Sequence, residues 1–247
     1  MSAAGAARLR PGRRVRAAAA AEWVKMRTIP DVAVAFGLTV LLIVAVSAAT
    51  AGADSPDRVH SALLGVQAGQ AVVAVWAVQM LAGEFGTGTI RPAFVAVPRR
   101  HVVLGVKALL LLGGVLTAAV VSVTTCLLAF SAGASGGIRA AAGSVLYLGL
   151  IALLGLGVAA IMRSAVASAG VVLGLLYLVP VVMGMFADPG IERAIYRIGP
   201  STAGLTVLST VDLDSLPIGP WAGLGVAAAW AFGALAAGAL IVGARDV

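Results

Sequence analysis

Six stretches of this chain, each at least 22 residues long, contain no Asp, Glu, Lys or Arg. They are residues 32–53, 59–83, 108–138, 140–162, 164–187 and 215–244. The hydrocarbon core of a bilayer, about 30 Å thick, requires about 20 apolar residues for each spanning helix. A fold of only 247 residues exposes too much of its chain to water to bury six such segments. We therefore predict an all-α integral membrane protein with six transmembrane helices.

The ends of the apolar stretches set the expected helix bounds. We expect spans at about 31–51, 61–83, 104–130, 142–162, 166–187 and 219–243. Apolar residues make up 61% of the chain, which leaves little of it for a water-soluble domain. We therefore predict one membrane domain over 22–247, preceded by an Arg- and Ala-rich cytoplasmic tail over 1–21. That tail lacks the apolar core of a cleaved signal peptide.

Basic residues are divided unequally between the two sides of the predicted membrane domain. The chain ends and every second loop carry 13 of the 17 Lys and Arg residues, and the other loops carry four. Because cytoplasmic loops carry an excess of Lys and Arg, we predict cytoplasmic termini and a location in the cell (plasma) membrane, in contact with its lipid. The net charge of +7 could also suggest nucleic-acid binding. We expect no nucleic-acid partner, because no basic module stands apart from the spans.

Residue types that catalyse reactions or bind metals are scarce. Cys126 is the single cysteine, and His60 and His101 lie on opposite predicted sides of the membrane, so we expect no metal site. The predicted spans contain no acidic or histidine pair at one depth, which argues against an intramembrane enzyme. The sequence Gly-x-x-x-x-Gly-Lys-Ser/Thr is also missing, so this chain is not expected to bind ATP through such a loop.

Three glutamines, Gln67, Gln70 and Gln79, lie within the second predicted span. Uncharged amides in hydrocarbon require hydrogen-bond partners. Gln67 and Gln70 are three residues apart and are expected to share a helix face, with Gln79 pointing elsewhere. Two roles stay open for them: hydrogen bonds between packed helices, which we favour, and contact with a substrate. The motifs Gly65-xxx-Gly69 and Gly170-xxx-Gly174 would permit close approach of helices.

The largest predicted external segment is 188–217, between the fifth and sixth spans. Its apolar residues follow the spacing i, i+3, i+4, i+7 from Ile191 to Ile198, which predicts a short amphipathic helix ending before Gly199. The apolar stretch that follows is too short to span, so we predict a re-entrant or interfacial segment there. Pro180 is expected to kink the fifth span.

The loop between the second and third spans, within 83–107, is the only predicted cytoplasmic loop long enough to form structure of its own. Glu84 would end the second helix, Thr87 or Thr89 could cap a short helix, and Lys107 would snorkel to the cytoplasmic surface. A short helix held between two spans can act as a lever, because a partner that pushes it moves both spans. An ordinary basic loop explains these residues equally well.

Several sequence features together resemble the membrane subunits of ABC transporters of the type-2 (exporter-like) class. The loop reads Glu-x-x-x-Gly-Thr-Ile-Arg over 84–91, then Pro-Arg-Arg over 98–100, then Lys107. A Glu-x-x-Lys-x-Arg run (22–27) precedes the first span, and Gly-Pro-Ser-x-Ala-Gly (199–204) precedes the last. The chain ends in Arg-Asp-Val directly after the sixth span. The order of these motifs on six spans carries the resemblance.

The resemblance implies a permease that works as an exporter and is not itself an enzyme. The apolar spans, with few fixed charges, favour an amphipathic or lipid-like compound as the cargo. ATP and Mg would be bound by a separate ABC ATPase subunit, and a second permease copy or a homologous permease would complete a dimer. The loop after the second span would be the coupling helix that docks onto the ATPase. The residues that the resemblance assigns to this contact are Glu84, Thr87, Thr89, Ile90, Arg91, Pro98, Arg99 and Arg100.

Two other functions stay open from the residues alone. Ion-coupled secondary transporters generally place acidic residues within the membrane. No Asp or Glu lies inside a predicted span, since Asp31 and Glu84 fall at span ends, and this disfavours such a carrier. A noncatalytic membrane anchor or assembly factor is compatible with every feature of the sequence.

Overall fold

The structure is a computed structural model of the chain, and it describes residues 24, 30–51, 56–87, 100–130, 136–185, 194 and 196–244. All regular secondary structure within these residues is helical. The helices are α3 (Pro30–Thr50), α4 (Arg58–Leu63), α5 (Gly65–Thr87), α7 (Arg100–Phe130), α8 (Gly137–Met162), α9 (Ala165–Leu173), the π-helix η1 (Gly174–Leu178), α10 (Val179–Gly184), α12 (Pro200–Gly204), the 3₁₀ helices η2 (Leu205–Leu208) and η3 (Leu213–Ser215), and α13 (Pro220–Ala244).

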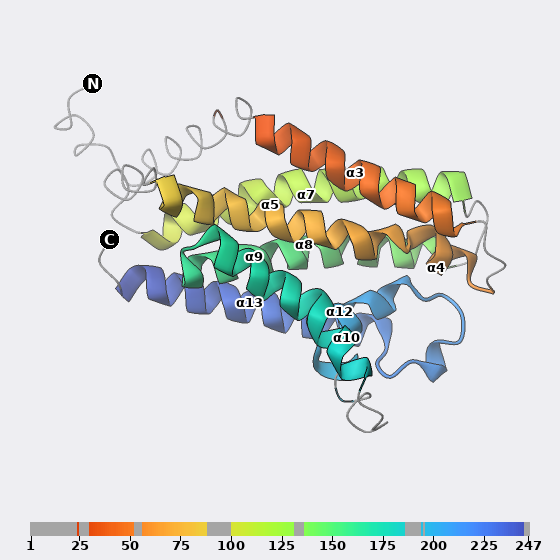
Figure 1. Cartoon of the computed structure of the whole chain (residues 1–247). Coiled ribbons are helices and arrows are strands. Elements are labelled where there is room, and N and C mark those ends of the chain that lie inside the picture. The colour runs from red at the N-terminus through yellow and green to blue at the C-terminus, as the bar shows by residue number, and fades with distance from the viewer. Residues whose placement is uncertain are drawn as a thin grey trace.

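Six helical segments in the described part of the chain are long and apolar enough to cross a membrane. They are α3, α4 with α5, α7, α8, α9 through α10, and α13, and successive segments run in opposite directions (Figure 1). As a result α3 begins at the end of the bundle where α5 and α13 finish. We call this the basic end, because Lys107 and Arg163 lie near it. The opposite end, where α4 and α12 lie, is the capped end. The prediction of an all-helical protein with six apolar spans is confirmed.

Several helices extend past the predicted span bounds, and at the start of the second span a side-chain cap accounts for the difference. The second span begins at Arg58 rather than 61, since the Asp57 side chain accepts a hydrogen bond from His60 N at 2.8 Å. It continues to Thr87 rather than 83, and the third span begins at Arg100 rather than 104. The fourth span begins at Gly137 rather than 142.

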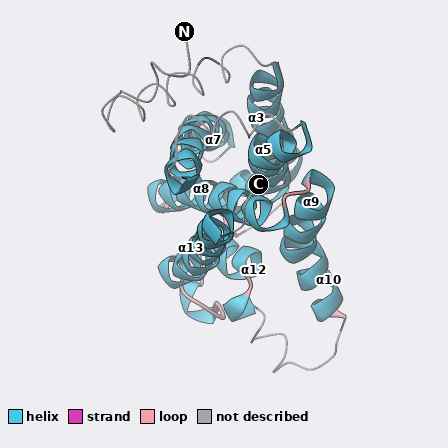
Figure 2. Cartoon of the chain, turned by 90° about the vertical axis from the view of Figure 1, so that its left-hand side faces the viewer, coloured by secondary structure: helices cyan, strands magenta, loops and turns pink. Residues whose placement is uncertain are grey.

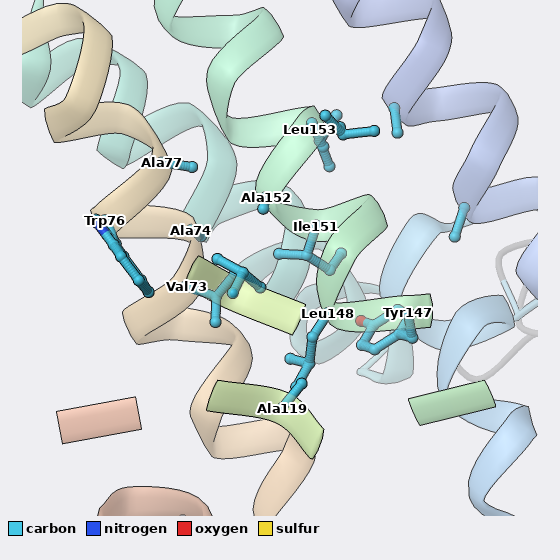
Figure 3. Packing of buried hydrophobic residues seen from close by; sticks show 14 of the residues in the cluster. Val73, Ala74, Trp76, Ala77, Ala119, Tyr147, Leu148, Ile151, Ala152 and Leu153 are labelled. Carbon is cyan, nitrogen blue, oxygen red and sulfur yellow. The ribbon is translucent and has the colours of Figure 1, made fainter. Parts of the chain in front are cut away.

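Helix α8 is the centre of the bundle. It packs against α13, α5 and α7, and its residues from Leu148 to Ala160 are almost all buried. Viewed along the bundle, α8 lies between α7 and α13 (Figure 2). The core contact with α5 is formed by Val73, Ala74 and Ala77 facing Leu148, Ile151 and Ala152 (Figure 3).

Glycines of α8 allow each neighbour to approach closely. A methyl group at Gly143 would lie 1.9 Å from the Val207 side chain of η2, and one at Gly157 would lie 2.5 Å from the backbone of Ala234 in α13. Gly149 similarly faces α7, and Gly155 faces α5. Between membrane helices, where hydrocarbon surrounds both partners, such small-residue contacts are a main source of packing energy.

The two Gly-xxx-Gly motifs found in the sequence behave differently. A methyl group at Gly65 would meet the Ile43 backbone at 2.0 Å, and one at Gly69 would meet the Ile43 side chain at 2.3 Å, so this motif does bring α3 onto α5. Gly170 and Gly174 have no described atom within 4 Å of such a methyl group. The second motif therefore makes no close helix contact within the described chain.

Candidate functional site

A buried ion pair joins α5 to α7 at the basic end. The Lys107 ammonium lies 2.8 Å from Glu84 Oε1; Lys107 is 0% exposed and Glu84 is 7% exposed. Glu84 precedes the end of α5 by three residues, and Lys107 lies two turns into α7. The pair therefore bridges the two helices that flank residues 88–99.

Two expectations about these residues are wrong. Lys107 does not snorkel to a surface, because the Glu84 carboxylate compensates its charge inside the bundle. Glu84 does not mark the end of the second span, since α5 continues to Thr87 and places this acid within the helix. A charged side chain is tolerated in such a place only with a partner, because the desolvation of an isolated charge is very costly.

The turn between α8 and α9 contacts the same region. Arg163 adopts a left-handed backbone conformation (φ 54°) that ends α8, and Ser164 Oγ accepts a hydrogen bond from Ala167 N to begin α9. The Arg163 guanidinium carbon lies 5.4 Å from the ring centroid of Phe85, a cation–π distance. Phe85 adjoins Glu84, so α5, α7 and the α8–α9 turn meet at this place.

Most of the predicted coupling residues lie outside the described residues. This applies to Thr89, Ile90, Arg91, Pro98 and Arg99, and to the short helix expected among them. Thr87 is the last residue of α5 and Arg100 the first residue of α7, with neither side chain described. Glu84 is thus the one predicted coupling residue whose contacts the structure describes. The predicted tail, 1–21, lies outside the described residues as well.

Gln70 takes part in a buried polar contact near the middle of the bundle. It is fully buried on α5, and its Oε1 accepts a hydrogen bond from the hydroxyl of Tyr147 on α8. Gln70 Nε2 has no hydrogen-bond partner among the described residues. The contact is a hydrogen bond between packed helices, one of the two roles left open for these glutamines.

The other two glutamines have exposed side chains. Gln67 and Gln70 occupy neighbouring positions around α5, but only Gln70 is buried. Three residues turn a helix by about 300°, and the boundary of the buried face falls between the two positions. The backbone carbonyl of Gln67 nevertheless accepts a hydrogen bond from the hydroxyl of Tyr177 in η1. Gln79 lies about 180° around α5 from Gln70, as nine residues of helix require.

Asp57 connects two loops at the capped end. Its carboxylate caps α4 and also accepts hydrogen bonds from the Thr210 backbone N–H, the Thr210 hydroxyl and the Val211 N–H. Burial alone would raise the pKa of Asp57, but these hydrogen bonds outweigh it and hold the pKa below its ordinary value. At neutral pH the carboxylate is therefore ionised and ties α4 to the segment that follows η2.

Sequence reasoning did not identify Tyr147, Tyr177 or Ser201 as partners in polar contacts. One signal was available, because the chain has only three tyrosines and two of them fall within otherwise apolar spans. A hydroxyl in hydrocarbon needs an acceptor, as a glutamine amide does. Which acceptor each hydroxyl would find depended on how the helices pack.

The described residues contain no group of three or more His, Cys, Asp or Glu side chains that could hold a metal ion. In comparisons with protein-family models and with curated proteins, nothing matches this chain. The described arrangement offers a mechanical connection between helices at the basic end and a hydrogen-bonding cluster in the middle of the bundle.

Proposed function

We propose that this chain is the transmembrane permease subunit of an ABC transporter that exports an amphipathic or lipid-like compound. The energy would come from ATP hydrolysed by a separate ATPase subunit, and two permeases would form the transport unit in the plasma membrane. The observation that carries the proposal is the buried Lys107–Glu84 pair, which joins α5 and α7 on either side of 88–99. The order of sequence motifs supports it independently.

The ion pair suits the mechanical role that the proposal requires. A partner that pushes on 88–99 acts directly on the end of α5 and the start of α7, which border this segment. Breaking a buried ion pair by removing one partner costs about 3–5 kcal/mol, so the two helix ends resist separation. Phe85 and Arg163 extend the joint to the α8–α9 turn. A push on 88–99 would therefore move four spans rather than one.

The proposal places the basic end in the cytoplasm, in agreement with the distribution of Lys and Arg. The coupling surface would include Thr87, Thr89, Ile90, Arg91, Pro98, Arg99 and Arg100. An ion-coupled carrier receives less support, because Glu84, a buried acid within a span, is engaged by Lys107. An amphipathic or lipid-like cargo suits spans that are apolar and carry few charges. The export direction follows from the family resemblance.

The test is whether an ATPase accompanies the chain, and whether that association depends on the loop. We expect an ABC ATPase to co-purify with the tagged full-length protein from native membranes, and the complex in lipid nanodiscs to hydrolyse ATP. Reversing two charges of the coupling surface, with Arg99→Glu and Arg100→Glu together, should reduce the co-purified ATPase at least tenfold.

The matched control is Arg13→Glu with Arg14→Glu, which reverses an equal charge in the N-terminal tail and should leave the ATPase bound. Equal expression and membrane insertion of the two double variants would show that the loss is specific. Co-purification of the ATPase with Arg99→Glu/Arg100→Glu at the wild-type level would contradict the assignment of the loop. The lack of any ATPase with the wild-type chain would contradict the proposed function.

A further inference from the structure

The fifth span is interrupted near its middle. Between α9 and α10 the five residues of η1 form a π-helix, in which Val179 N–H donates to the Gly174 carbonyl five residues before it. Pro180 follows immediately and has no N–H. The Leu176 carbonyl, four residues before Pro180, therefore lacks the donor that an α-helix would provide. Short π-helices within α-helices are rare and occur frequently at functional sites.

The missing donor comes from another part of the chain. Ser201 Oγ, in α12, donates a hydrogen bond to the Leu176 carbonyl at 2.8 Å, and Ser201 is only 3% exposed. This contact gives the Gly-Pro-Ser-x-Ala-Gly motif a physical role. Pro200 begins α12, Ser201 reaches the open carbonyl, and Gly204 fits against the Tyr147 ring, where a methyl group would lie 2.4 Å from a ring carbon.

A second polar contact holds η1 against α5. The Tyr177 hydroxyl donates to the Gln67 carbonyl of α5, next to the buried Gln70–Tyr147 hydrogen bond. Both contacts hold residues of η1 itself: Ser201 holds Leu176, and Gln67 holds Tyr177.

The two halves of the span differ in how firmly they are packed. Ser168 and Val172 in α9 are fully buried, and α9 packs on α5 and α8. Val166 and Val171 of α9 are exposed, but in α10 no residue with a described side chain is buried, and Val179, Val181 and Val182 are all exposed. The half beyond the break is therefore held chiefly by η1 and by the contacts that η1 makes.

We propose that η1 is a hinge and that the Ser201–Leu176 hydrogen bond is the latch that holds η1, and with it Tyr177, beside the buried Gln70–Tyr147 pair. Conversion of the π-turn to an α-turn would shorten the hydrogen-bond spacing from five residues to four. This shift of one residue would rotate α10 by about 100° around the helix axis. That rotation would separate Tyr177 from Gln67 and uncover the Gln67 carbonyl and Gln70 Nε2. The hinge is a property of this chain alone, whereas its use as a gate for cargo rests on the proposed function.

The test is hydrogen–deuterium exchange of the purified full-length chain in phosphatidylethanolamine–phosphatidylglycerol nanodiscs, with no ATPase present. Ser201→Ala removes the latch, so we expect amide exchange over 176–184 to accelerate about 2- to 12-fold, the range that corresponds to one net hydrogen bond. Pro180→Ala supplies an N–H to the Leu176 carbonyl. In that background, Ser201→Ala should accelerate exchange less than twofold.

The matched control is Ser168→Ala, which removes a buried hydroxyl from the same span whose hydrogen bond, to the Ser164 carbonyl at 2.6 Å, is local. It should leave exchange over 176–184 unchanged. Tyr177→Phe removes the second contact without altering α12 and should also accelerate exchange there, which keeps the proposal testable if Ser201→Ala fails to fold.

The double variant decides between a latch and a general loss of packing. Equal acceleration of exchange by Ser201→Ala in the wild-type and Pro180→Ala backgrounds would overturn the proposal. So would a Ser201→Ala protein that folds and whose amides over 176–184 exchange at the wild-type rate. The exchange measurement includes no ATPase, so it can contradict the hinge while the ATPase still co-purifies with the chain. Conversely, if the exchange results support the hinge and no ATPase co-purifies, only the proposed transporter function is contradicted.

Discussion

At the scale of single residues, the clearest feature is a pair of opposite charges inside an apolar bundle. Glu84 and Lys107 are 23 positions apart in the sequence, on different helices, yet their charged atoms are 2.8 Å apart. Each would be unfavourable in that place alone, and together they satisfy one another. The pair thus makes the relative position of α5 and α7 a requirement for stability.

Removing one member of this pair should destabilise the protein more than removing both. We expect Lys107→Met to lower stability by about 3–5 kcal/mol, because it leaves the Glu84 carboxylate buried without its cation. The double variant Glu84→Gln/Lys107→Met should recover most of that loss. Tryptophan fluorescence during thermal unfolding in detergent would measure both, with Asp31→Asn, at an exposed position, as control. A double variant no more stable than Lys107→Met would contradict the pairing.

At the scale of helices, packing depends on small residues that face particular neighbours. The sequence motif Gly65-xxx-Gly69 correctly indicated a close helix contact, whereas Gly170-xxx-Gly174, with the same spacing, makes none in the described chain. The α8 glycines from Gly143 to Gly157 follow no such motif, and each of these four faces a different helix. Spacing alone reports which glycines share a face, and the fold decides whether a neighbour lies against that face.

Alanine substitutions at two glycines should therefore differ in their effect on stability. Gly157→Ala should destabilise the bundle, since its methyl group would collide with the α13 backbone near Ala234. Gly113→Ala, in α7, should be neutral or stabilising by up to about 1 kcal/mol, because no described atom lies within 4 Å and alanine is the better helix former. Unfolding midpoints in the same detergent measure both. Equal midpoints would show that α8 and α13 are not closely packed there.

At the scale of the whole molecule, six helices run alternately and bring the start of α3 and the end of α13 to one end (Figure 1). The Lys and Arg asymmetry predicts that this end faces the cytoplasm. The capped end, with α4, α12 and η2 joined through Asp57 and Thr210, would then face outward.

Orientation can be tested by labelling single cysteines in a Cys126→Ala background. A cysteine at Ser215, exposed in η3, should react with a membrane-impermeant maleimide applied to intact cells. A cysteine at Asp31, exposed at the start of α3, should react only after the cells are permeabilised. The opposite pattern would reverse the orientation and remove the coupling loop from the reach of a cytoplasmic ATPase.

By itself, the sequence determined that the chain is helical and has six apolar spans, because each span requires only a run of residues that hydrocarbon accepts. It also singled out Gln70, since polar groups are conspicuous in apolar helices, whereas Glu84 was expected at a helix end and drew attention through the family resemblance. Only the tertiary structure decided their partners, Lys107 and Tyr147, and the role of Ser201 opposite Pro180. Hydropathy is a sum over neighbouring residues in the sequence. A hydrogen bond between helices depends instead on how each helix is rotated about its axis and how far it is shifted along the bundle, and helix packing alone sets both.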